Sequence, residues 1–164
     1  MTRDGSRAIG KGSFDVLVET YGRRALALAE RIVGHPEDAQ DVYQEAWFAV
    51  WKALPRLRRK NVPWAFIRRT FVNAALDRVR ARKRGIRIAT GMDPEPAVTA
   101  RRASIDLSPL KPGQRAALLL FFWEGLSIRE IAAELGVAEG TVKTWMHRGR
   151  ALLRESLLRE ERVR

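Results

Sequence analysis

The chain has 164 residues, of which 46% are hydrophobic and 30% charged, a composition typical of folded globular proteins. Its net charge of +12 favours a polyanionic partner such as nucleic acid over a small neutral substrate. Without cysteine the chain has no disulfide or cysteine-ligated zinc, and its two histidines, His35 and His147, are too far apart in sequence to suggest a metal site. We expect no cofactor. The chain also lacks an apolar signal core and the roughly 18 apolar residues of a membrane span, so we expect a cytoplasmic protein without membrane insertion.

Three helices are predicted in the first half of the chain. Gly34 ends the first, residues 13–33, in which apolar residues recur on one side at helical spacing. A second helix is predicted from Pro36 to about Leu54, and a third from Pro63 to Gly85, which we expect to close it. The apolar stripe of the first helix consists of Phe14, Leu17, Val18, Tyr21, Ala25, Leu28 and Ile32.

A linker and three further helices are predicted in the second half. Scattered Gly and Pro without a sustained period indicate a linker, whose ~24 residues could reach ~80 Å when fully extended. Helical patterns follow at residues 112–124, 127–135 and about 139–161, and strand patterns are essentially lacking. The fold class is therefore all-α, with two small helical domains joined by a flexible linker. The predicted parts are a tail (1–12), a first domain (13–84), the linker (85–107) and a second domain (108–164).

The most specific passage is SIREIAAELGVAEGTVKTWMHRGRALL, residues 127–153, which predicts a helix-turn-helix. Ser127 and Glu130 have the spacing of a capping box at a helix start, and Gly136 suits the sharp turn. In such motifs the first turns of the second helix enter the major groove of DNA. The alternative is a plain helical hairpin with a solvated charged face. The candidate DNA-reading residues are Thr141, Lys143, Thr144, His147 and Arg148.

Basic residues concentrate between residues 56 and 87, where the only acid is Asp77. Lysine and arginine can contact phosphates, while exposed aromatic rings can stack on unpaired bases. Trp64, Phe66 and Phe71 are interleaved with the basic residues, and the alternative is that these rings belong to the core. The twelve basic residues are Arg56, Arg58, Arg59, Lys60, Arg68, Arg69, Arg78, Arg80, Arg82, Lys83, Arg84 and Arg87.

The second predicted helix has the opposite character. Asp41, Gln44 and Glu45 share one face at helical spacing, with Phe48 one turn further on. Either this face is simply solvated, or it is a docking surface for a basic partner.

Together these passages resemble the extracytoplasmic-function (ECF) type of bacterial sigma factor, which keeps only sigma domain two and sigma domain four. PEDAQDVYQEAWFAVWKAL is similar to the family's polymerase-binding helix, and FIRRTFVNAALDRVRARKR to its helix that recognises the minus-ten promoter element. LKPGQRAALLLFFWEGLSIREIAAELGVAEGTVKTWMHRGRALL resembles its domain four. The resemblance implies a transcription initiation factor, not an enzyme, that carries core RNA polymerase to promoter DNA and helps to open it.

The resemblance also implies residue roles and partners. Asp41, Gln44, Glu45 and Phe48 would bind the clamp helices of the largest polymerase subunit, and domain four would meet the flap region. The expected minus-ten residues are Arg58, Lys60, Asn61, Arg69, Asn73 and Arg80, with the loop 57–61 holding a base flipped from the stack. Thr141, Lys143, Thr144, His147 and Arg148 would read the minus-thirty-five element, while Trp145 stands where a basic phosphate contact is common. An anti-sigma factor is a further implied partner.

Two other classes of protein are compatible with parts of the sequence. A helix-turn-helix regulator that binds an operator without polymerase explains the second domain equally well, but not the acidic helix or Asn73 in its basic and aromatic setting. A magnesium-dependent nuclease could use Asp38, Asp41 and Glu45, because neighbouring carboxylates bind hard cations. No carboxylate from another segment is evident in the sequence to complete such a site.

Overall fold

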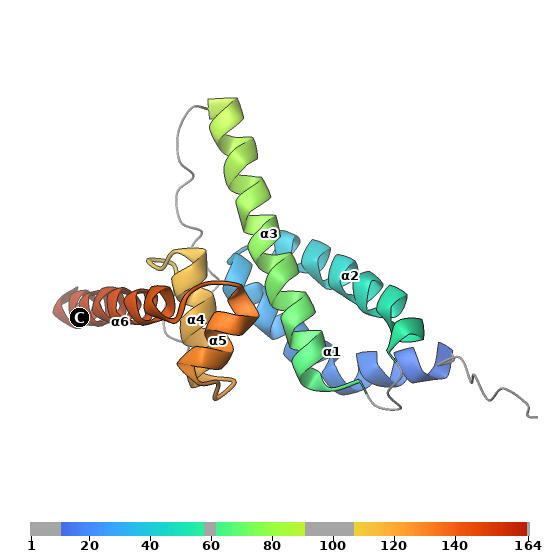
Figure 1. The fold of residues 1–164 in the computed structure, drawn as a ribbon. Coiled ribbons are helices and arrows are strands. Elements are labelled where there is room, and N and C mark those ends of the chain that lie inside the picture. The colour runs from blue at the N-terminus through green and yellow to red at the C-terminus, as the bar shows by residue number, and fades with distance from the viewer. Residues whose placement is uncertain (1–10, 58–61, 91–106, 164) are drawn as a thin grey trace, which may run out of the picture.

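The computed structural model describes residues 11–57, 62–90 and 107–163, and side chains at 14–57, 62–85 and 107–159. Within these ranges the secondary structure is helical, which confirms the all-α prediction (Figure 1). None of the described helices is long and apolar enough to cross a membrane. The helices are α1 (Lys11–Val33), α2 (Pro36–Ala53), α3 (Trp64–Thr90), α4 (Pro112–Phe122), α5 (Ile128–Leu135) and α6 (Glu139–Val163), with a short 3-10 turn η1 (Leu54–Arg56).

Helices α1, α2 and α3 pack against one another and form the N-terminal bundle. Phe71 of α3 is fully buried at its centre, with its ring centroid 5.5 Å from that of Trp47 and 5.9 Å from that of Tyr43. Both pairs are edge-to-face, the geometry that aromatic quadrupoles favour. Phe14 of α1 meets Trp47 edge-on at 5.6 Å, so rings from all three helices close the core.

Helices α4, α5 and α6 form the C-terminal bundle, with the predicted helix-turn-helix in α5 and α6. The Ser127 side chain accepts a bond from the backbone N–H of Glu130, and the Glu130 carboxylate accepts one from the Ser127 N–H at 2.8 Å, which confirms the capping box. Gly136 ends α5 at φ 65°, a left-handed conformation that glycine adopts without a steric penalty. Val142 and Met146 are buried beneath the start of α6.

One expected helix boundary was wrong. Gly85 does not close the third helix, which continues to Thr90. A glycine inside a helix costs only about 1 kcal/mol relative to alanine, and Gly85 does not have the positive φ of a glycine that caps a helix. The C-terminal half of α3 therefore projects beyond both bundles (Figure 1).

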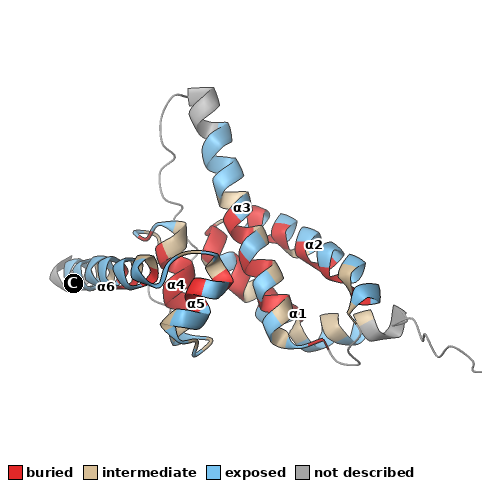
Figure 2. Ribbon diagram, viewed as in Figure 1, coloured by how far each residue is buried: buried red, intermediate tan, exposed pale blue. Residues whose placement is uncertain are grey.

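The two bundles pack against each other, which the sequence does not predict. Helix α4 contacts α1 and α3, and α5 contacts α3. The buried apolar residues of both bundles form one continuous cluster, and Figure 2 shows buried positions on the facing sides of α1, α3, α4 and α5.

Candidate nucleic-acid and protein interfaces

The acidic face of α2 is exposed, and it includes aromatic surface. Asp41, Gln44, Glu45 and Phe48 are all exposed. The Phe48 ring stacks on Trp51 with centroids 5.9 Å apart, although 53% and 51% of these residues remain exposed to solvent. The residues predicted from the sequence did not include Trp51. Its i+3 spacing from Phe48 was the signal that could have placed both rings on one face of the helix. Carboxylates beside a stacked aromatic pair form a surface suited to a protein partner rich in basic groups.

Arginines of α3 hold the N-terminal end of this face. Asp38 is buried, and it accepts bonds from Arg78 at 2.9 Å and Arg82 at 2.7 Å. Burial opposes ionisation of Asp38, but the two arginines outweigh burial and hold the pKa of this carboxyl below its ordinary value. Arg78 also pairs with the exposed Asp41. Arginines thus neutralise Asp38 and Asp41, two of the three carboxylates that a magnesium-dependent nuclease could use. No cluster of three metal-ligating side chains occurs among the described residues.

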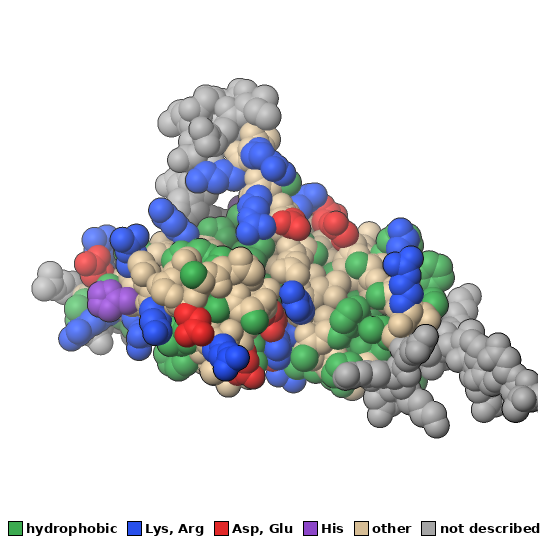
Figure 3. All heavy atoms as spheres, in the orientation of Figure 1, with side chains coloured by type: hydrophobic (Ala, Val, Ile, Leu, Met, Phe, Trp, Pro, Cys, Tyr) green, Lys and Arg blue, Asp and Glu red, His purple; other side chains and the backbone are tan. Residues whose placement is uncertain are grey.

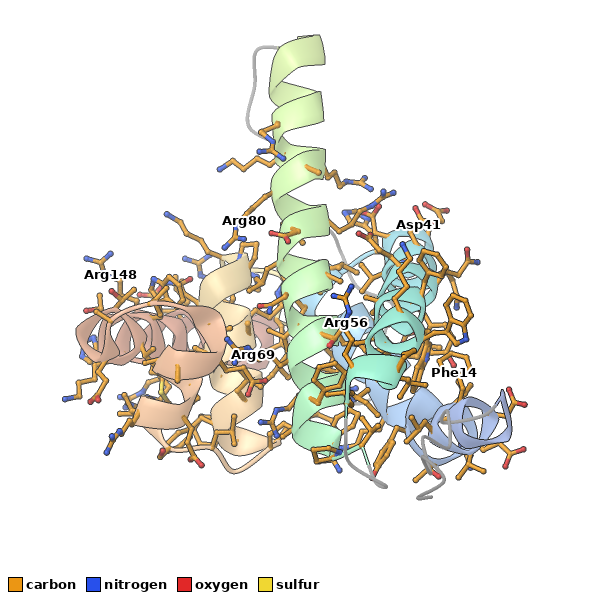
Figure 4. The ribbon with its side chains drawn as sticks, turned by 45° about the vertical axis from the view of Figure 1, so that its right-hand side comes forward. Phe14, Asp41, Arg56, Arg69, Arg80 and Arg148 are labelled. Atoms are coloured by element: carbon orange, nitrogen blue, oxygen red, sulfur yellow. The ribbon has the colours of Figure 1, made fainter. Side chains whose placement is uncertain are left out.

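Three predicted minus-ten residues share an exposed face of α3. Arg69, Asn73 and Arg80 follow one another at i, i+4 and i+11, so they lie along one side of the helix. In Figure 4 the labelled arginines of this set lie on the side of α3 opposite to Asp41. Arg80 pairs with Asp77 at 2.8 Å, and both side chains are well exposed. The other three predicted residues, Arg58, Lys60 and Asn61, lie outside the described part of the chain.

The predicted minus-thirty-five residues gather at the start of α6. Thr141 is half-buried, whereas Lys143, Thr144, His147 and Arg148 are exposed over the apolar base. Figure 3 shows lysine and arginine side chains around α6 and along the projecting part of α3. This arrangement presents a polar helix face that can enter a DNA groove.

Trp145 has a structural role in the C-terminal bundle. It is half-buried and lies over the start of α4, where a Cβ added to Gly113 would come within 2.8 Å of the indole ring. The absence of a side chain at Gly113 thus makes room for the indole. The position at which the resemblance predicted a basic phosphate contact is occupied here by a packing residue.

The aromatic residues among the basic ones belong mainly to the core, so the alternative left open above is the correct one. Phe71 is fully buried and Phe66 is half-buried against the core. Trp64 is half-buried and stacks on Tyr21 with centroids 5.4 Å apart. These rings do not form a platform for bases in this structure.

The basic residues between positions 56 and 87 include some that pair with carboxylates of the chain and others that are exposed to solvent. Arg68 is buried between the bundles, and Arg78 and Arg82 pair with Asp38. These three arginines are bound to carboxylates of the same chain, so the stretch is less available to phosphates than its sequence suggests. The residues with the exposure needed for DNA contact include Arg69 and Arg80.

Carboxylates of the C-terminal bundle receive their partners from the N-terminal bundle. Arg68 of α3 donates two bonds to Glu134 of α5, at 2.9 and 2.7 Å, and these bonds raise the pKa of the guanidinium. Glu124 accepts bonds from Trp64 Nε1 at 2.6 Å and from Arg24 at 2.8 and 3.3 Å. The sequence does not reveal this cluster, because each bond joins residues at least 60 positions apart and no local pattern marks such pairs.

Comparison with known proteins agrees with this geometry. The family patterns described as "Sigma-70 region 2" and "Sigma-70, region 4" match residues 17–85 and 107–153. The RNA polymerase sigma-E factor of Streptomyces coelicolor is 35% identical, over 88% of this chain and 86% of its own length. The ECF RNA polymerase sigma factor SigM of Mycobacterium tuberculosis is 34% identical, over 86% of this chain and 75% of its own.

A solved structure has the same fold. The sigma factor RpoE from Bartonella quintana, solved in complex with the anti-sigma factor NepR, superposes with a TM-score of 0.68. The superposition covers 88% of this chain and 96% of that one, at 24% sequence identity.

The chain belongs to the sigma-70 family of RNA polymerase sigma factors, as a member of the small ECF type. It is a non-enzymatic transcription initiation factor that binds core RNA polymerase and directs it to promoter DNA.

Proposed function

We propose that this sigma factor divides its work among three exposed faces. The face of α2 binds polymerase, the face of α3 binds the minus-ten element, and the start of α6 reads the minus-thirty-five element. The observation that carries the proposal is the separation of charge: an acidic and aromatic surface on α2, and basic and polar surfaces on α3 and α6.

The α2 face is assigned to the clamp helices of the largest polymerase subunit. Its carboxylates, Asp41 and Glu45, complement a basic partner, and such complementarity speeds encounter and fixes orientation. Phe48 and Trp51 add exposed aromatic surface next to these charges, and aromatic residues are prominent among binding hot spots. Lys52 lies 4.2 Å above the Phe48 ring and covers part of it.

The α3 face is assigned to the minus-ten element. Arg69 and Arg80 can contact phosphates, and Asn73 between them can form hydrogen bonds with an unpaired base. In this proposal Arg58, Lys60 and Asn61 hold a base flipped from the stack. Capturing that base offsets the few kcal/mol of unstacking, so recognition assists strand opening.

The start of α6 is assigned to the minus-thirty-five element. Thr141, Lys143, Thr144, His147 and Arg148 lie in the turns that enter the major groove in helix-turn-helix proteins. Among them, the forked guanidinium of Arg148 suits the paired acceptors of guanine.

The proposal also includes two further partners and a cellular location. The C-terminal bundle meets the polymerase flap, and an anti-sigma factor holds the protein inactive, as the RpoE complex with NepR suggests by analogy. All these partners place the protein in the bacterial cytoplasm.

Run-off transcription tests the proposal. Purified core polymerase is assayed with and without this chain on promoter fragments from the source genome. We expect transcripts that depend on the chain and share a pair of upstream DNA elements. A folded chain that binds duplex DNA, but does not bind core polymerase and yields no transcripts, would favour the operator-binding regulator instead.

The Glu45→Arg variant tests the polymerase face. Reversing this exposed charge should weaken core binding about tenfold or more, because a repulsive pair replaces an attractive one. Core binding is measured by fluorescence anisotropy, with duplex binding to the minus-thirty-five element as the control. Loss of duplex binding as well would indicate misfolding, and unchanged core binding would contradict the assignment.

A further inference from the structure

One acid lies within the basic surface of α3. Asp77 is the only acidic residue between positions 56 and 87, a stretch otherwise rich in arginine and lysine. It is well exposed, with 72% of its side chain accessible to solvent. An exposed acid repels the phosphates that the surrounding arginines attract, so it lowers the general affinity of this surface for DNA.

Asp77 lies on the same face of α3 as the proposed minus-ten residues. It follows Asn73 by four positions and Arg69 by eight, and it precedes Arg80 by three. With 3.6 residues in each helical turn, these side chains fall within an arc of about 80°. All of them are exposed, and Figure 4 shows Arg69 and Arg80 on the same side of the helix. A nucleic acid that contacts this face therefore meets the carboxylate of Asp77 as well.

The stability of the helix does not account for this acid. Its Oδ1 accepts a bond from Arg80 Nη1 at 2.8 Å, but 65% of the arginine side chain is exposed too. An ion pair between two exposed side chains contributes little, because water and salt screen it and both side chains lose freedom. The buried acid that packs against α3 is Asp38, which pairs with Arg78 and Arg82. Asp77 thus contributes to the surface of α3 more than to its packing.

A carboxylate only accepts hydrogen bonds, and this limits what Asp77 can recognise in DNA. Ionised aspartate has about four lone-pair sites on its two oxygens, and Arg80 uses one of them. Adenine, cytosine and guanine each carry an exocyclic amino group that donates. Thymine has no amino group and presents carbonyl oxygens on either side of its single N–H, and these oxygens repel a carboxylate. Asp77 can therefore bind a base that carries an amino group and reject thymine.

We propose that Asp77 is a specificity residue of the minus-ten surface, which recognises the exocyclic amino group of one unpaired base and excludes thymine at that position. Arg80 orients the carboxylate through its bond to Oδ1. This inference rests on the proposed function, because it takes the α3 face as the minus-ten surface, and the base is a different one from that assigned to the loop 57–61. Repulsion thus lowers general affinity but adds discrimination, as specificity often requires.

Binding of the holoenzyme, core polymerase with the full chain, to single-stranded DNA tests the proposal. Run-off transcription first identifies the minus-ten element. Labelled non-template oligonucleotides then carry, at each position of the element, a base with an amino group or its counterpart without that group. The pairs are 5-methylcytosine against thymine, and adenine or guanine against hypoxanthine. At one position, fluorescence anisotropy should show the amino-bearing oligonucleotide binding at least about fivefold more tightly.

The Asp77→Asn variant identifies the residue responsible. Asparagine has nearly the same size and keeps an oxygen that can accept from Arg80, but its amide also donates and can pair with a thymine carbonyl. We expect the ratio of the two affinities to fall below about twofold, mainly because the thymine oligonucleotide binds more tightly. Asp15→Asn makes the same change of charge at an exposed position of α1 and should leave the ratio unchanged.

The pattern across the oligonucleotides separates base recognition from other roles. A uniform change in Asp77→Asn would show that Asp77 acts only on phosphates or on the helix, and would overturn the proposal. So would a holoenzyme that prefers no amino-bearing base at any position. In both cases the holoenzyme still binds DNA and initiates transcription, so the assignment of the three faces would stand. A holoenzyme that neither binds the oligonucleotides nor yields transcripts would remove the α3 assignment and, with it, the role of Asp77.

Discussion

The two bundles neutralise their buried acids in different ways. Asp38 of the N-terminal bundle is paired with Arg78 and Arg82 of the same bundle. Glu124 and Glu134 of the C-terminal bundle are paired with arginines of the other. Region 2 thus pairs its buried acid within its own bundle, whereas the acids of region 4 depend on arginines of the neighbouring bundle. Charge pairing can therefore join domains as well as stabilise each one.

The hydrophobic cores of the two bundles also differ, in the kind of side chain that they bury. The N-terminal core is built around large interlocking rings, with Phe71 in contact with Trp47 and Tyr43. Among the described residues, the buried side chains of the C-terminal bundle include no aromatic ring, and its core is built from aliphatic residues such as Leu118, Leu120 and Ile131. Each ring buries more area than any of these side chains, so we expect the N-terminal bundle to supply most of the stability of the chain.

Phe71→Ala should have the largest effect and tests the self-sufficiency of the N-terminal bundle. Removing a fully buried ring should lower the free energy of unfolding by about 3–5 kcal/mol. Denaturant unfolding followed by circular dichroism measures it. Phe48→Ala, which removes a half-exposed ring, should cost less than about 1 kcal/mol. Equal losses in the two variants would contradict the core described for this bundle.

Arg148→Ala should act on DNA recognition by the C-terminal bundle without changing its packing. If Arg148 reads a base edge, the loss should be about 1–3 kcal/mol and confined to one position of the minus-thirty-five element. Binding to a panel of single-base variants of that element measures it. Arg154→Ala, further along α6, should have a smaller and sequence-independent effect. A uniform loss in Arg148→Ala would make this residue a phosphate contact.

Asp38→Asn tests the internal pairing of the N-terminal bundle through pH. The lowered pKa of Asp38 means that its stabilisation is complete above its unfolded pKa of about 4 and is lost as the pH falls through the folded value. The variant should be about 1–2 kcal/mol less stable at pH 7, with the difference shrinking in acid. Thermal melts from pH 7 down to roughly pH 2, a range that continues below the ordinary aspartate pKa of about 4, measure it. A difference that is constant over this range would rule out the charge as its source.

Ser127→Ala should have the smallest effect. Losing an N-cap side chain costs about 1 kcal/mol, and here the loss falls on α5, which carries Glu134. The same melts measure it, with Ser127→Thr, which keeps a hydroxyl at the cap, as the matched control. Similar losses in both variants would show that the hydroxyl does not act as the cap.

The sequence by itself determined the helices, the helix-turn-helix and the three candidate faces. Helical spacing places Asp41 beside Glu45 and Thr144 beside Arg148, and the capping box marks the start of α5, because all these features depend on residues a few positions apart. The wrong end assigned to α3 at Gly85 shows the limit even of local patterns, because a glycine weakens a helix without necessarily ending it.

Only the tertiary structure decided which charges face solvent and which hold the bundles together. In the sequence Arg68 resembles Arg69, yet Arg68 is buried against Glu134 while Arg69 is exposed. In the same way, Phe71 is a core residue and not a platform for bases. Arg68 and Glu134 are 66 positions apart, and Phe71 packs against rings of a different helix. The physical reason is that burial and pairing are set by packing in three dimensions, which no local pattern encodes.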